Sequence, residues 1–192
     1  MIDATATVRP IVEQTRRAID SGLYFVALIS ALTIPDMLAA LGSENGRATG
    51  KKYRTWLTDH LPHYDAATAQ RVWDFRCSLL HQGSARPAGQ PPIAFIDPTG
   101  SDIQIHMITT RIWDGDVLEE VVFWISVPNF IAEIEHASED WLAKFGESRY
   151  VQSNLERFAR RRPEGLSPHV GAAPGLNLIY TGDLPSPVAV IA

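Results

Sequence analysis

One stretch of sequence indicates the fold, and it reads Val72-Trp73-Asp74-Phe75-Arg76-Cys77-Ser78-Leu79-Leu80-His81-Gln82-Gly83. Its apolar residues recur at helical spacing, so one face of this segment belongs to a core. Upstream, Asp65 is a capping carboxylate followed by strong helix formers, and Gly83 is a typical helix stop. The pattern predicts a helix over residues 66–82 that carries two groups suited to phosphate chemistry, Arg76 and His81.

Arg76 and His81 are separated by five positions, which places them roughly 140° apart on a regular helix. They therefore do not lie side by side on one straight helical face. Either His81 lies in the fraying last turn before Gly83, or a second copy of the chain completes the site. The spacing predicts a homodimer whose interface contains the C-terminal part of the 66–82 helix.

The run Arg76-Cys77-Ser78-Leu79-Leu80-His81, followed by Gln82-Gly83, resembles the Arg-x(4–6)-His motif of the HEPN superfamily. Members of this superfamily are small helical bundles. Many are metal-independent endoribonucleases of toxin–antitoxin and other defence systems, whereas others have lost catalysis and serve as dimerisation or nucleotide-binding modules. The resemblance covers residues 8–83 and the helices after residue 127. Cys77 stands where catalytic members often carry a polar residue such as Asn.

The resemblance implies that Arg76 and His81 are the catalytic residues of a dimeric endoribonuclease, with RNA and an antitoxin-like protein as partners and no cofactor. His81 would transfer protons, and Arg76 would stabilise the charge that develops on the phosphate. A noncatalytic module is the alternative. In that case His81 only satisfies the helix end, while Arg76 pairs with a carboxylate such as Asp74 or Asp36. Burial of Arg76 against a carboxylate would favour this alternative.

Composition limits the other functions of the chain. It has 192 residues, 45% hydrophobic and 20% charged, which predicts one soluble domain over residues 1–192. A net charge of −5 argues against nonspecific coating of nucleic acid. The lone Cys77 and the absence of a signal-peptide pattern at Met1 predict a reducing, cytoplasmic location. Six scattered histidines lack ligand spacing, so no metal site is predicted.

Residues 8–83 are predicted to form a helical bundle. An amphipathic helix over 8–21 is followed by the apolar run 23–32, which is too short to cross a bilayer and is interpreted as a buried helix rather than a membrane segment. Thr33 is expected to cap a new helix with Pro35 in its first turn. A further helix is expected over residues 51–61.

Residues 84–126 are predicted to form a β-hairpin insertion. Strands at 93–96 and 103–108 flank an Asp-Pro-Thr-Gly turn within 97–102, which predicts that they pair as an antiparallel hairpin. A second turn at 114–116 leads to a third strand at 121–125. His106 is expected on the exposed face of this sheet.

Residues 127–162 are predicted to form further helices. Ser126 caps a helix that ends at Gly146, and a last helix covers 150–160 with its arginines at a solvated end. The segment 163–192 is expected to be an extended tail, packed as coil or used as a partner-binding arm. The predicted class is mainly α, a HEPN-like helical bundle with a small antiparallel β-hairpin or three-stranded sheet inserted after the motif helix.

Overall fold

The computed structural model describes residues 2–84, 92–96, 105–162, 165–166, 170–171 and 178–181. Within these ranges the chain is mainly helical. The six helices are α1 (Ala4–Asp20), α2 (Tyr24–Leu41), α3 (Gly50–His60), α4 (Ala66–Gln82), α5 (Val127–Phe145) and α6 (Arg149–Leu155). A single apolar cluster joins side chains of all six helices to strands β1 and β3. The predicted mainly helical class is confirmed.

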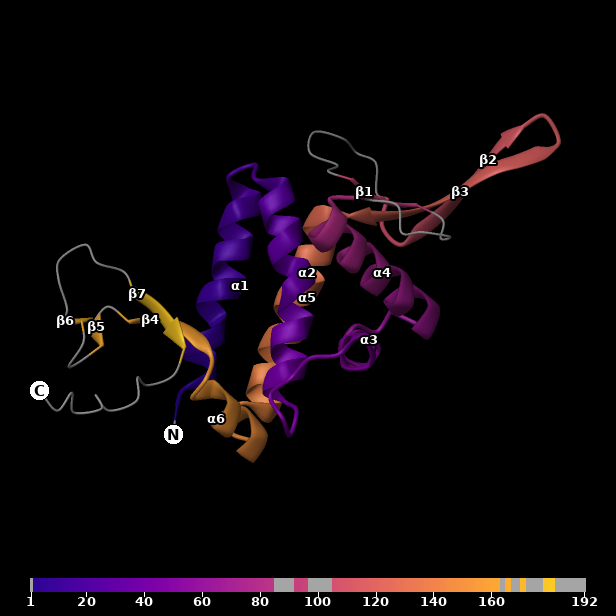
Figure 1. Cartoon of the computed structure of the whole chain (residues 1–192). Helices are drawn as coiled ribbons and strands as arrows, with labels where there is room; N and C mark the ends of the chain where they lie inside the picture. Colours follow the sequence, from indigo (N-terminus) through magenta and orange to yellow (C-terminus); the bar gives the residue numbers. More distant parts are fainter. Residues whose placement is uncertain are drawn as a thin grey trace, which may run out of the picture.

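Helix α2 is the centre of the bundle. It contacts α1, α3, α4, α5 and α6, and Figure 1 shows α1, α2 and α5 running alongside one another. The predicted break at Thr33 is wrong, because the helix continues through a buried Pro35. A proline inside a helix removes one backbone hydrogen bond and costs about 3 kcal/mol. Burial of Leu32, Ile34 and Leu38 on either side offsets that loss.

Because α2 is continuous, its apolar stretch is longer than the ten residues inferred from the sequence. Its 18 residues are long and apolar enough to cross a bilayer by length and composition, although 44% of them are buried inside the protein. The sequence-based conclusion that this apolar run is too short to cross a bilayer is therefore wrong, because it depended on the predicted break at Thr33. At the start of the helix the large apolar residues Leu23, Phe25 and Val26 are exposed.

Helix α4, which carries the motif, has the predicted boundaries. The Asp65 carboxylate accepts a hydrogen bond from the backbone N–H of Thr68 at 2.7 Å. Gly83 has φ 64°, and its N–H donates to the carbonyl of Leu79 at 3.0 Å. This left-handed ending favours glycine, because other residues pay a steric penalty there. Both capping predictions are confirmed.

The sheet is mixed rather than antiparallel. It contains β1 (Ile93–Ile96), β2 (Ile108–Asp114) and β3 (Val117–Ser126) in the order β1-β3-β2. β1 is parallel to β3, and only β2 is antiparallel to it. The predicted hairpin between 93–96 and 103–108 is therefore wrong for the described part of the second strand, since Ile108 pairs with β3 on the side away from β1; residues 97–104, which include the predicted turn, lie outside the described residues. The long apolar β3, with Phe123 and Ile125 buried, takes the central position between both neighbours.

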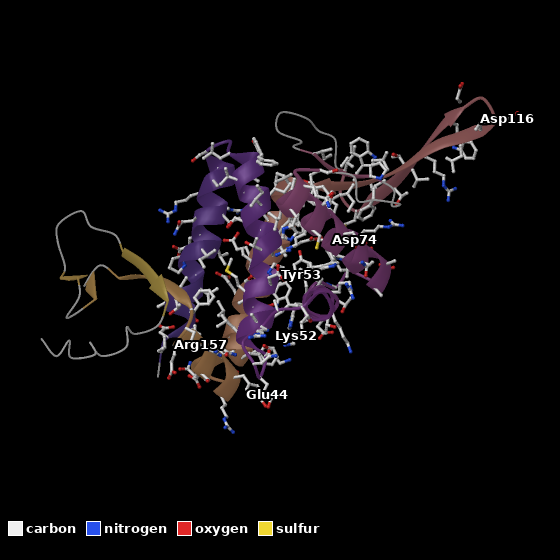
Figure 2. All side chains as sticks on the ribbon, in the orientation of Figure 1. Glu44, Lys52, Tyr53, Asp74, Asp116 and Arg157 are labelled. Carbon is white, nitrogen blue, oxygen red and sulfur yellow. The ribbon has the colours of Figure 1, made fainter. Side chains whose placement is uncertain are left out.

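The hairpin of the structure is formed by β2 and β3. The predicted turn at 114–116 is confirmed, because Asp114 pairs with Val117 and Gly115 has φ 57°. This hairpin projects away from the helices (Figure 1), and Figure 2 shows Asp116 at its tip, remote from Tyr53 in the bundle. β2 begins only at Ile108, because Met107 has a positive φ of 57° that interrupts the strand.

The last helices follow the prediction only in part. The Ser126 hydroxyl caps α5 by accepting from the N–H of Asn129, as predicted. Helix α6 ends at Leu155 instead of residue 160, and Ala159–Arg162 forms strand β4. β4 pairs with β7 (Leu178–Thr181), and β5 (Gly165–Leu166) pairs with β6 (Val170–Gly171). The tail thus supplies strand partners that helical periodicity does not reveal; the rest of 163–192 lies outside the described residues.

Candidate functional site

Arg76 of α4 forms an ion pair with Asp36 of α2. The guanidinium Nη2 lies 2.6 Å from the carboxylate Oδ2, and the two side chains are only 17% and 16% exposed. Asp74, the other carboxylate considered for Arg76, instead accepts a hydrogen bond from Gln70 on its own helix at 2.8 Å. Of the two carboxylates predicted as partners for Arg76, Asp36 is the one that pairs with it in the structure.

Two aromatic side chains lie next to this pair. The Arg76 guanidinium carbon lies 5.2 Å from the centre of the Trp73 ring, within the range of a cation–π interaction. Trp73 in turn packs 5.0 Å from Tyr53 of α3, whose hydroxyl donates to the buried carbonyl of Leu32. Gly50 makes room for Trp73, since a Cβ at this position would lie 2.8 Å from the indole ring.

Burial dominates the electrostatics of the pair. It raises the pKa of Asp36, while the charge of Arg76 and its contact with the carboxylate act in the opposite direction. Burial also raises the pKa of Tyr53, and the Asp36 charge adds to that rise. Within the described residues, Asp36 Oδ2 and Arg76 Nε are buried without a well-directed hydrogen bond. The pair is therefore held by charge and packing more than by aligned hydrogen bonds.

His81 lies apart from this cluster. It is exposed in the last turn of α4, whereas Arg76 is directed toward α2. The structure of one protomer does not bring the two motif residues into a common site. Cys77, the residue after Arg76, is half-buried and has a free thiol.

A second polar group, missed by the sequence analysis, lies where the hairpin meets the bundle. Glu133 of α5 accepts from the hydroxyl of Tyr64 at 3.1 Å, and its other oxygen lies 3.1 Å from Nε2 of His106. His106 Nδ1 accepts from the backbone N–H of Ser126 at 3.3 Å. The expectation that His106 is a surface residue is wrong, because these contacts hold it against the bundle.

This second group has the features of a structural connection. Because Nδ1 accepts a hydrogen bond, the imidazole proton lies on Nε2 and is donated to Glu133. Both ring nitrogens of His106 are then engaged, so neither is available to a substrate. Burial raises the pKa of Tyr64, and the Glu133 charge adds to the rise. The sequence does not indicate the positive φ of Met107, the residue next to His106, so it could not have located this group.

The described residues contain no group of three or more His, Cys, Asp or Glu side chains that could hold a metal ion. No protein-family model, curated protein or solved structure matches the chain.

Proposed function

We propose that this chain is a noncatalytic, HEPN-like interaction module that associates with a second copy of itself through the β2–β3 hairpin. The observation that carries the noncatalytic part is the Asp36–Arg76 ion pair. An arginine that stabilises a transition state must present free N–H groups to the phosphate. Here the guanidinium is half-buried, stacked on Trp73 and neutralised by a carboxylate.

An RNA phosphate at Arg76 would have to compete with Asp36. Displacing that carboxylate would leave a second negative charge beside the phosphate in a partly buried site, and like charges at this distance repel. The structural role of Arg76 follows from the same contact, because the pair joins the motif helix α4 to the central helix α2.

Metal-independent RNA cleavage is the second candidate function, and the position of His81 favours it. This histidine is exposed at the end of α4, where a substrate or a second copy of the chain could reach it. Cleavage would require a dimer built on that helix end and the release of Arg76 from Asp36. The two functions therefore place the dimer interface on different surfaces.

The hairpin supports association through its exposed apolar residues. Trp113 and Leu118 are paired across the two strands and are 55% and 43% exposed, and Val117 is 67% exposed. β2 is the last strand of the sheet, so one of its edges has no strand partner among the described residues. Unpaired edges with apolar side chains are templates for strand addition.

Light scattering tests this association. We expect the wild-type chain to be a dimer and Trp113→Ser to shift it toward monomer. Tyr150→Ser is the matched control, since Tyr150 is also an exposed aromatic residue, on α6, and is expected to leave the dimer intact. A wild-type monomer at every accessible concentration would remove the proposed association.

The same measurement distinguishes the two interfaces. A dimer that is insensitive to Trp113→Ser but weakened by substitutions near His81 would favour the ribonuclease arrangement instead.

A further inference from the structure

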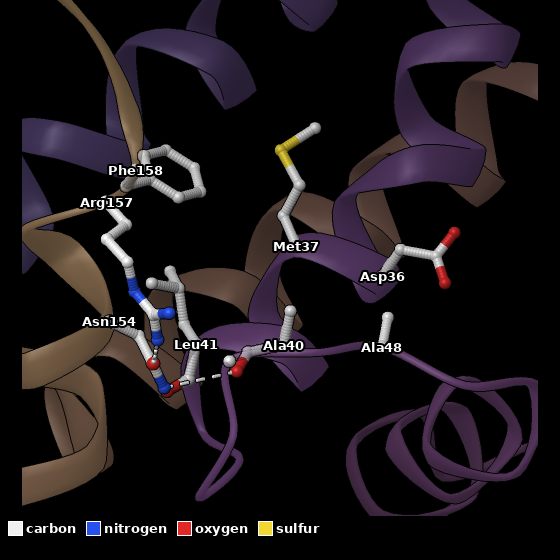
Figure 3. Close-up of a pocket in the computed structure, with 9 residues that line it drawn as sticks. Asp36, Met37, Ala40, Leu41, Ala48, Asn154, Arg157 and Phe158 are labelled. Atoms are coloured by element: carbon white, nitrogen blue, oxygen red, sulfur yellow. Dashed lines mark hydrogen bonds between the residues drawn. The ribbon is translucent and has the colours of Figure 1, made fainter. Parts of the chain in front are cut away.

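A cavity of about 330 Å³ lies between the C-terminal half of α2, the loop that follows it and the end of α6. This volume is at the lower end of the range for small-molecule sites. The cavity is lined mainly by apolar side chains, including Met37, Ala40, Leu41 and Phe158 (Figure 3). Arg157 lies at its wall and supplies a positive charge.

Asn154 positions the Arg157 guanidinium. Its amide nitrogen donates to the carbonyls of Leu41 at 2.9 Å and Ser43 at 2.7 Å, which caps the C-terminal end of α2. Its amide oxygen accepts from Arg157 Nη2 at 3.1 Å. Asn154 is only 6% exposed, so its orientation is set by buried contacts. Asn154 thereby holds Nη2 of the Arg157 guanidinium in place, and the remaining N–H groups of the guanidinium can donate to a ligand.

Gly46 lines the cavity next to Asn154 and Arg157. It has φ 65°, and a Cβ at this position would lie 2.5 Å from Asn154 Oδ1 and 2.9 Å from Arg157 Nη2. Any larger residue would have to displace the guanidinium. The close approach of the Gly46 backbone thus depends on glycine and keeps the Arg157 side chain in place.

The other charged residue of the lining does not compete for Arg157. Figure 3 shows the Asp36 carboxylate directed away from Arg157 and Asn154, and Asp36 is neutralised by Arg76. The C-terminal carbonyls of α2 are occupied by Asn154, which reduces their repulsion of an anion. The donors left in the lining are therefore those of Arg157.

We propose that this cavity binds a small monocarboxylate with an apolar body, whose carboxylate contacts Arg157 and whose body packs on Met37, Leu41 and Phe158. A carboxylate matches the planar guanidinium geometry and supplies the acceptors that the lining lacks. An apolar body matches the rest of the wall. This site is independent of the proposed dimerisation, because no hairpin residue lines it.

A heteronuclear NMR titration with benzoate tests the proposal, with benzamide as the neutral ligand of similar shape. We expect benzoate to bind in the millimolar range, as suits so small a ligand, and to shift the amide resonances of Ala40, Gly46 and Ala48. Benzamide should bind at least tenfold more weakly, because it lacks the charge-assisted contact. Equal affinities for the two ligands would overturn the proposal.

Two variants locate the ligand. Arg157→Gln is expected to weaken benzoate binding by about tenfold to a hundredfold and to leave benzamide unchanged. Arg149→Gln is the matched control, because Arg149 is exposed on α6 and does not line the cavity. Ala48→Leu fills the cavity and should reduce the binding of both ligands. Unchanged benzoate binding in Arg157→Gln, or no binding of benzoate, isovalerate or hexanoate by the wild-type protein, would refute the site.

Discussion

The guanidinium of Arg76 lies 2.6 Å from the carboxylate of Asp36, so the arginine of the motif helix is bound to the central helix of its own protomer. This contact determines how the motif is interpreted. It links the middle of α4 to the C-terminal half of α2, next to the packed rings of Trp73 and Tyr53. The ion pair therefore lies at the junction of three helices.

Removing the positive charge of this pair should destabilise the fold. In Arg76→Met the Asp36 carboxylate stays in a partly buried site without its partner, which we expect to cost about 3 kcal/mol at neutral pH. Arg9→Met, on the exposed face of α1, is the control and should change stability by less than about 0.5 kcal/mol. Urea denaturation measures both.

The pH dependence of this loss identifies its cause. Without Arg76, nothing opposes the burial that raises the pKa of Asp36. The folded variant then holds a proton more tightly than the unfolded chain, so its stability falls as pH rises through the window above the ordinary pKa of aspartate. Adding Asp36→Asn should recover most of the loss. A penalty that is the same in acid and at neutral pH would contradict this explanation.

His60 gives a second pH effect, of opposite sign. Burial lowers its pKa, since the imidazole packs against Trp56 at 5.1 Å and Phe145 at 6.2 Å. The unfolded chain binds this proton more readily, so the contribution of His60 is complete above about pH 6.5 and is lost as pH falls through its folded pKa.

We therefore expect His60→Gln to reduce the slope of stability against pH below about 6.5. His63→Gln, at an exposed histidine three residues away, is the matched control. Thermal unfolding at a series of pH values gives both slopes. Identical slopes in wild type and His60→Gln would show that burial of this side chain does not control its protonation.

Two glycines with similar backbone angles should respond differently to alanine. Gly83 has φ 64° and no atom near a new Cβ, so Gly83→Ala should cost only the strain of a left-handed residue, about 1–2 kcal/mol. Gly46→Ala adds a clash with Asn154 and should cost more. Denaturation of the two variants makes the comparison. Equal losses would mean that the Asn154–Arg157 contact is easily displaced.

Local sequence patterns correctly predicted those helix ends and turns that are determined by residues close by in the sequence. The Asp65 and Ser126 caps and the left-handed Gly83 lie where the residue types indicate, because each satisfies backbone groups within four positions. The turn at Gly115 was predictable for the same reason.

Tertiary packing overrode the local signals elsewhere. Pro35 does not end its helix, because apolar neighbours on both sides are buried. Residues 105–107 do not extend β2, because His106 is held by Glu133 and Ser126. Helix α6 is shorter than predicted, because β4 pairs with β7, a segment nearly twenty residues farther along the chain.

From the sequence, the ion pair at the candidate site could be predicted only as a choice between two carboxylate partners for Arg76. Arg76 is prominent in the sequence, and Asp36 is a carboxylate beside an apolar run, yet nothing local distinguishes Asp36 from Asp74 as its partner. The choice depends on how α4 packs against α2. Arg157 and Asn154 carry no sequence signal of a cavity, because the wall opposite them is more than a hundred residues away in the chain.

Incubation of the purified protein with RNA in excess EDTA tests the central claim most directly. If Arg76 is a structural partner of Asp36 and the chain is an interaction module, the RNA remains intact, and DNA behaves in the same way. Cleavage that leaves a 2′,3′-cyclic phosphate, and that falls by about 10²–10⁴-fold in His81→Ala while the fold survives, would contradict the account and establish the ribonuclease.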